Sequence, residues 1–390
     1  MTTNNFTESE ERQELRKAVR EFGKGFGPTY FLAAAHEGRK TDELWAAAAK
    51  NGYVGVNIPE EYGGGGGDLG DLAAVLEELA AAGAPLLMLV VSPAIVGTII
   101  NDFGTDDQKN RWLPGVADGS ARYAFAITEA DAGSNSHKIV TTAYRTEDGG
   151  WRLTGNKTFI SGVDEATHML VVARTEDAKT GNLKPALFMV PTDAEGLVRN
   201  EIDMGLVLPE KQFTLFFDDI LLPYDALVGS EDAAIAQLFA GLIPERIMGA
   251  SMALGSARLA VEKAVEYANA RKVFKDTPIG AHQAISHPLA EIHMEIEAAR
   301  LVTQKAAALH AAGDHMAAGE AANIAKYLAG EVSVRAVDQA IQTHGGNGLA
   351  REYGLVDMVT SSRLGRIAPV SREMVLNFVA QFSLGLPKSY

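Results

Sequence analysis

The fold of this 390-residue chain is decided by its alanine-rich C-terminal part, which opens with Pro244–Ala270, PERIMGASMALGSARLAVEKAVEYANA. Two stretches of the same character follow, Gln283–Ala312 and Met316–Gln342, and a shorter one lies at Val370–Phe382. The three long stretches each run for roughly 25 to 30 residues of good helix formers, and the connections between them are short and contain Gly or Asp. Long helices joined in this way predict an antiparallel four-helix bundle.

The preceding part of the chain has a different pattern, in which short β-rich runs are separated by Gly, Asp, Asn and Pro. These runs are Tyr123–Thr128, Ile139–Arg145, Trp151–Ile160, Met169–Ala173, Ala186–Val190 and Phe213–Leu222. Short strands of regular spacing with turn residues between them predict an antiparallel barrel or sandwich.

The N-terminal part returns to helical periodicity. Apolar residues recur at spacings of three and four at Leu15, Val19, Phe22 and Phe26. Further helices are expected at Asp71–Ala82 and Ser92–Asn101. The predicted fold class is therefore mainly α with a central β domain. We expect a helical N-terminal domain over residues 1–119, a middle β domain over 120–228 and a helical bundle over 229–390.

Composition and charge exclude several classes of function. The net charge of −15 argues against nucleic acid as a partner, because phosphate neutralisation needs a basic face. The absence of cysteine excludes disulfides, thiolate zinc sites and cysteine nucleophiles. The longest apolar run, residues 84–100, is interrupted by two prolines and is too short for a stable membrane insertion. The N-terminal sequence is polar and acidic, so we expect a cytoplasmic protein.

Two motif matches carry little weight. Gly65–Gly70 fits the pattern G-x-G-x-x-G, but no predicted strand precedes it, so a flexible turn is the better interpretation. The nine histidines form no metal-binding motif, and we expect no metal site.

Three clusters carry more chemistry, although each has a plain structural interpretation. A strand-to-loop corner presents hydroxyl groups at Thr128 and Ser134, which suit the edge of a flavin or a phosphate. The glycines of Gln342–Gly348 either cap a long helix or let a phosphate approach the backbone. Arg271 at the end of a predicted helix is favoured there by the helix dipole alone.

Taken in order, these clusters and several others resemble the acyl-CoA dehydrogenase family over nearly the whole chain. The motifs that carry the resemblance are Pro59–Gly64, Phe103–Lys109 with Leu113-Pro114, Thr128-Glu129 with Gly133-Ser134, Gly155–Lys157 with Ile160-Ser161, Arg271 and Phe274 with His282-Gln283, and Gln342 with Gly345–Gly348. The resemblance implies the same order of helical, β and helical domains. It also implies FAD between the β domain and the bundle, in a homotetramer.

The resemblance also assigns site residues. The cofactor-binding set that it implies is Phe125, Ile127, Thr128, Gly133, Ser134, Phe159, Ser161, Arg271, Phe274, Gln283, Gln342, Gly345, Gly346 and Ser371. Within it, Phe159 stands where the family has a tryptophan beside the ring, and Ser161 stands where a side chain hydrogen-bonds the N5 region of the flavin. Arg271, Phe274, Gln283, Gln342 and Gly346 would contact the cofactor of a neighbouring subunit. Ser134 and Arg246 are the expected substrate contacts.

The catalytic carboxylate is expected at Glu245. Most of the family carries a glutamate in a loop after the Gly-Gly-Asn-Gly turn, where this chain has Pro369, and no acid occurs between Asp357 and Glu373. A minority carries it just before an arginine on the first long bundle helix, which is the pair Glu245-Arg246 here. The structural alternative is that Glu245 is simply an acid that the helix dipole favours at the N-terminus of a helix whose first turn contains Pro244.

Pro369 raises a second question, because proline has no N–H to donate to the thioester carbonyl. Either Val370 donates instead, or the flavin ribosyl hydroxyl does.

The implied function is FAD-dependent dehydrogenation of an acyl-CoA to the trans-2-enoyl-CoA in fatty acid and lipid metabolism, with electrons passed to an electron-transfer flavoprotein. Two alternatives stay open. One is a flavin-dependent monooxygenase or oxidase on the same fold, and the other is a non-catalytic subunit of a hetero-oligomeric dehydrogenase. The Glu245 carboxylate favours the first function, because a monooxygenase needs no base for a thioester.

Overall fold

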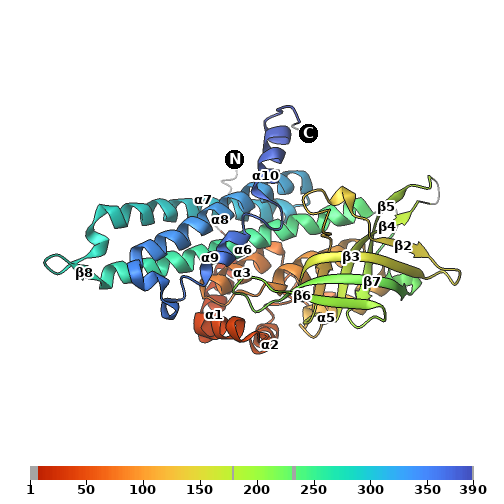
Figure 1. Cartoon of the computed structure of the whole chain (residues 1–390), viewed down its shortest axis with the longest axis horizontal. Coiled ribbons are helices and arrows are strands. Elements are labelled where there is room, and N and C mark those ends of the chain that lie inside the picture. Colours follow the sequence, from red (N-terminus) through yellow and green to blue (C-terminus); the bar gives the residue numbers. More distant parts are fainter. Residues whose placement is uncertain (1–7, 178–179, 231–233, 389–390) are drawn as a thin grey trace.

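The bundle, the sheet and the N-terminal helices occupy different parts of an elongated molecule. A computed structural model describes residues 8–177, 180–230 and 234–388. Long helices extend toward one end, the sheet occupies the other, and the N-terminal helices pack beside both in the middle (Figure 1). The predicted fold class, mainly α with a central β domain, is confirmed.

Three long helices form the bundle: α6 (Ala234–Ala270), α7 (Gln283–Ala311) and α8 (His315–His344). Their facing sides bury mainly alanine, leucine, isoleucine and valine, so the alanine-rich sequence lets the helices pack closely. The predicted start of the first helix at Pro244 is wrong, because Pro244 lies inside α6. Packing of the apolar residues on both sides of this proline outweighs the backbone hydrogen bond that it removes.

The predicted fourth helix is much shorter than its partners. The chain after α8 forms α9 (Met358–Leu364), α10 (Arg372–Phe378) and a π-helical turn, η8 (Val379–Ser383). This last segment leaves the bundle toward the C-terminus (Figure 1).

The β domain is one sheet of seven strands. Six of them pair in the order β1-β4-β2-β3-β7-β6, and the seventh, β5, pairs with β4. The strands are β1 (Tyr123–Ala126), β2 (Thr142–Arg145), β3 (Trp151–Ser161), β4 (His168–Glu176), β5 (Leu183–Pro191), β6 (Leu197–Ile202) and β7 (Gln212–Leu222). Most pairs are antiparallel, but β1 and β2 both run parallel to β4. The expected antiparallel barrel or sandwich is thus a mixed sheet, in which the parallel pairs join strands that are not connected by a tight hairpin.

The N-terminal domain brings α1 (Glu10–Glu37), α2 (Asp42–Lys50), α3 (Leu69–Ala81), α4 (Thr98–Phe103) and α5 (Asp106–Ala117) together around η2 (Val90–Gly97), a π-helical segment. α3 is buried almost all around. It touches α6 so closely that a Cβ atom at Gly255 would lie 2.3 Å from the Glu77 carbonyl oxygen.

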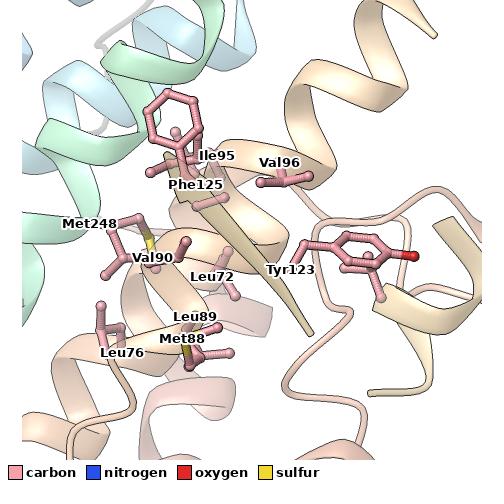
Figure 2. Packing of buried hydrophobic residues seen from close by; sticks show 14 of the residues in the cluster. Leu72, Leu76, Met88, Leu89, Val90, Ile95, Val96, Tyr123, Phe125 and Met248 are labelled. Atoms are coloured by element: carbon pink, nitrogen blue, oxygen red, sulfur yellow. The ribbon is translucent and has the colours of Figure 1, made fainter. Parts of the chain in front are cut away.

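One hydrophobic core connects the three parts. Val90 of η2, Phe125 of β1 and Met248 of α6 belong to the same buried cluster, and Figure 2 shows them with their neighbours. Because Phe125 and Met248 lie close to the predicted cofactor and base positions, this shared core fixes the strand and the helix that carry them. None of the helices in the described ranges combines the length and hydropathy that a bilayer crossing requires.

Candidate active site

The corner after β1 carries the first group of predicted flavin contacts. Phe125 is buried, Ile127 and Thr128 are partly buried, and Gly133 and Ser134 are exposed on the loop that follows. A buried ion pair holds this corner, because the Lys157 ammonium donates to Glu129 Oε1 at 2.9 Å and to the Ile127 carbonyl at 2.9 Å.

The ion pair is itself anchored to the backbone. Glu129 accepts hydrogen bonds from the N–H groups of Val140 at 2.7 Å and Thr141 at 3.0 Å. Burial would raise the pKa of Glu129, but these bonds and the Lys157 charge outweigh it and keep the pKa below its ordinary value. For Lys157, burial dominates and lowers the pKa to about 8. The corner is therefore rigid and presents its hydroxyl groups on a fixed frame.

The end of β3 presents an exposed aromatic ring in a strained conformation. Phe159 has φ of 56° at a β-bulge, and 57% of it is exposed. Backbone strain of this kind is concentrated at ligand sites. Two residues on, Ser161 Oγ lies 3.1 Å from Oε1 and 2.9 Å from Nε2 of Gln212 on β7. An open ring beside a fixed hydroxyl fits the apolar rings and polar edge of a flavin.

The second group of predicted cofactor contacts lies at the other end of the molecule (Figure 1). Arg271, Phe274, Gln283, Gln342 and Gly346 are all exposed where α6, α7 and α8 end or begin, around the hairpin of β8 (Lys272–Val273) and β9 (Thr277–Pro278). Figure 1 shows this hairpin at the end of the bundle remote from the sheet. One chain therefore does not bring the two groups together.

The glycine turn after α8 is held in place by stacked rings. Gly345 caps α8 with φ of 59°, as the capping alternative predicted. The ring of His344 stacks on Tyr267 at 4.2 Å, and Asn347 Nδ2 donates to the Tyr267 hydroxyl at 3.1 Å. The turn is thus fixed against Tyr267, which lies four residues before Arg271, and its glycines leave the backbone open to a phosphate.

Glu245 lies in the middle of α6 and not at its N-terminus, so the interpretation as a helix-dipole acid is wrong. Glu245 is partly buried, and burial raises the pKa of its carboxyl to about 7, against the opposing charges of Arg246 and Lys326. Arg246 donates to the Leu242 carbonyl at 2.6 Å, and burial lowers its pKa.

The loop that lacks the usual carboxylate passes close to this part of α6. A Cβ atom at Gly249, one turn after Glu245, would lie 3.5 Å from Cδ of Pro369. From the other side, the Lys326 ammonium of α8 donates to the Val370 carbonyl. Ser371 lies next to it, and its hydroxyl accepts from the Met374 N–H at 3.3 Å as the N-cap of α10. The loop of Pro369 and Val370 thus lies between the part of α6 that carries Glu245 and the buried Lys326 of α8.

Sequence reasoning missed two residues of this site. Gln212, which holds the Ser161 hydroxyl, is distant from it in sequence and carries no motif. Lys326 left a signal, because it is a lone cation in the run Ala321–Gly330, which is otherwise small and apolar apart from Asn323 and Tyr327. A charged residue in a helix of this kind is buried only with partners.

Comparison with known proteins identifies the family. The chain matches the N-terminal domain of acyl-CoA dehydrogenase over residues 9–120, the middle domain over 124–220 and the C-terminal domain over 235–384. It is 63% identical over 390 residues to acyl-CoA dehydrogenase FadE12 of Mycobacterium tuberculosis H37Rv, with 100% of each chain covered. This chain belongs to the acyl-CoA dehydrogenase family.

More distant relatives share the whole architecture. The long-chain specific mitochondrial acyl-CoA dehydrogenase of Rattus norvegicus is 30% identical over 376 residues, which cover 96% of this chain and 86% of the rat protein. The structure of butyryl-CoA dehydrogenase from Megasphaera elsdenii matches with a TM-score of 0.89 at 29% identity, over 95% of this chain and 97% of that one. The chain is thus an FAD-dependent acyl-CoA dehydrogenase, an oxidoreductase that acts on CH–CH bonds.

Proposed function

We propose that this acyl-CoA dehydrogenase removes the α-proton of its acyl-CoA thioester with Glu245. The observation that carries the proposal is the place of Glu245 on α6, one turn before Gly249, which lies against Pro369. Burial raises the pKa of the Glu245 carboxyl to about 7, which suits a general base near neutral pH. Its position beside the loop of Pro369 supports the role, since the resemblance places the reacting thioester there. The product would be the trans-2-enoyl-CoA.

The chain and its cofactor divide the work. When it is bound, FAD provides the acceptor for the β-hydride. Glu245 takes the α-proton on a carboxylate oxygen. The thioester carbonyl needs a hydrogen-bond donor, which would be the Val370 N–H or the flavin ribosyl hydroxyl, because Pro369 has none.

The exposed second group of cofactor contacts supports a shared site. Arg271 and Gln342 would reach the FAD of a neighbouring subunit, which agrees with the expected homotetramer. We further infer that electrons pass to an electron-transfer flavoprotein, that the enzyme acts in lipid metabolism and that it works in the cytoplasm. Purification as a tetramer with one FAD per chain, reduced by an acyl-CoA and reoxidised by such a flavoprotein, would support this assignment.

Glu245→Gln tests the base directly. The amide keeps the size and hydrogen bonding of the side chain but removes its basicity, and a positioned base contributes about 10²–10⁴ in rate. We expect anaerobic flavin bleaching by a panel of acyl-CoAs to slow by at least about 100-fold, with FAD and acyl-CoA still bound.

The matched control is Glu147→Gln, the same change at an exposed turn between β2 and β3, which should leave bleaching unaltered. A Glu245→Gln enzyme that bleaches within about threefold of the unaltered rate, far less than the loss of a general base, would move the base elsewhere.

A further inference from the structure

Lys326 is the most deeply buried cation near the proposed base, although none of the motifs of the site includes it. It lies in the middle of α8 and is only 2% exposed. Its ammonium donates to the carbonyl of Val370, the residue that directly follows Pro369. A buried ammonium is costly unless its charge and its donors are used. The groups around Lys326 must therefore use its charge and its hydrogen-bond donors.

Four charged groups on three helices act on Lys326. They are Glu245 and Arg246 on α6, Glu331 on α8 itself and Glu373 on α10. Burial lowers the pKa of Lys326 to about 8, and the charge of Arg246 acts in the same direction. The three carboxylates oppose this shift, so Lys326 keeps its charge at neutral pH.

Two of these carboxylates have cations of their own. Glu331 pairs with Arg366 at 2.8 Å, and Glu373 lies 3.5 Å from Arg372. Glu245 differs, because no ion pair within 4 Å is found for it among the described residues, and its opposing charges are Arg246 and Lys326. The charge of Lys326 therefore acts on the proposed base, while its hydrogen bond acts on the loop.

We infer that Lys326 is a positioning residue with two effects: it ties the loop of Pro369 and Val370 to the bundle, and its charge favours the carboxylate form of Glu245. The inference rests on the proposed function, because it takes Glu245 as the base. It accounts for a cation where the chain has lost the usual loop glutamate. The Arg366–Glu331 ion pair holds the start of this loop against α8, and the bond from Lys326 to Val370 holds the part that follows Pro369.

Three substitutions separate the two effects. Lys326→Met removes both the charge and the donor, Lys326→Gln removes the charge but keeps a donor for Val370, and Lys326→Arg keeps both. The first measurement is the pH dependence of anaerobic flavin reduction. Loss of a nearby positive charge disfavours a carboxylate, so the acid limb should move up by about one pH unit in the Met and Gln variants. The Arg variant should restore the original limb.

The second measurement does not depend on catalysis. Hydrogen exchange of the amides in residues 365–371 should quicken at least tenfold in the Met variant, and should stay close to the unaltered protein in the Gln and Arg variants. Because the Gln variant keeps the hydrogen bond to the loop, it serves as the folded test of the charge effect if the Met variant loses FAD.

An acid limb that stays in place in the Gln variant overturns the inference, as does unaltered loop exchange in a folded Met variant. These outcomes differ from failure of the proposed function. If Glu245→Gln stays active, both the base assignment and this inference are overturned. If Glu245→Gln is inactive but the acid limb of Lys326→Gln does not move, only the role of Lys326 is overturned.

Discussion

Glu245→Gln should stabilise the folded protein, and the gain should grow with pH. Burial raises the pKa of Glu245 from 4.5 to about 7, so the folded chain holds this proton more tightly than the unfolded chain. The free energy of unfolding is therefore highest below pH 4.5, where the carboxyl is protonated in both states, and it falls as the pH rises through 7 and the buried carboxyl becomes charged. With about 1.4 kcal/mol for each pKa unit, the carboxyl costs about 3 kcal/mol at pH 8 and about 1 kcal/mol at pH 5.

Glutamine carries no charge at either pH, so the variant escapes this cost. Thermal unfolding of the FAD-saturated protein at pH 5 and pH 8 measures the effect. Each kcal/mol shifts the Tm of a chain of this length by about 1 °C, so the gain at pH 8 should exceed that at pH 5 by about 2 °C. Glu147→Gln, at an exposed turn, should show no such difference. An equal gain at the two pH values would refute the argument that burial sets the pKa of Glu245.

Three further predictions concern the frame of the site. Lys157→Met leaves a buried carboxylate without its cation, so urea unfolding should show a loss of about 3–5 kcal/mol and FAD titration a weaker affinity; an unaltered midpoint would contradict this. Arg271→Glu should lower the FAD-to-protein absorbance ratio while gel filtration shows the oligomer intact, and full FAD content would count against the shared site. Gly255→Ala should cost about 1–3 kcal/mol because its Cβ atom would overlap an α3 carbonyl, whereas Gly249→Ala, with room for a methyl group, is its control.

Long elements of uniform composition could be predicted well from the sequence. Gln283–Ala312 was expected to be helical, and α7 spans Gln283–Ala311, because helix formers fill the stretch and a polar connection ends it. Pro244 misled the prediction of α6, since local preference places proline in a first turn while the apolar residues before it are packed into the same helix. The strand β6 is missed because Arg199, Asn200 and Glu201 in its middle are exposed and polar, which hides the apolar alternation of a strand.

The site could be predicted only as far as motifs reach along the chain. The motifs predict Glu245 and the corner that carries Thr128 as parts of the candidate site, because neighbours in sequence define them. They could not supply the pairing of Ser161 with Gln212 or of Lys326 with Val370, since tertiary packing brings these residues together across 51 and 44 positions. The enclosure that raises the pKa of Glu245 is equally a product of packing and leaves no trace in its local sequence.

The separation of the Thr128 corner from the Arg271 surface has a consequence for mixtures of defective chains. If subunits share their sites as proposed, a pair made of one Arg271→Glu chain and one Lys157→Met chain contains one site that carries both lesions and one that carries neither. Co-expression of two inactive chains should then restore FAD binding and activity in part, whereas mixing them after stable assembly should not. The Thr128 corner and the Arg271 surface would then complement each other between subunits, because a defect in one region of a chain is made good by the intact region of its neighbour.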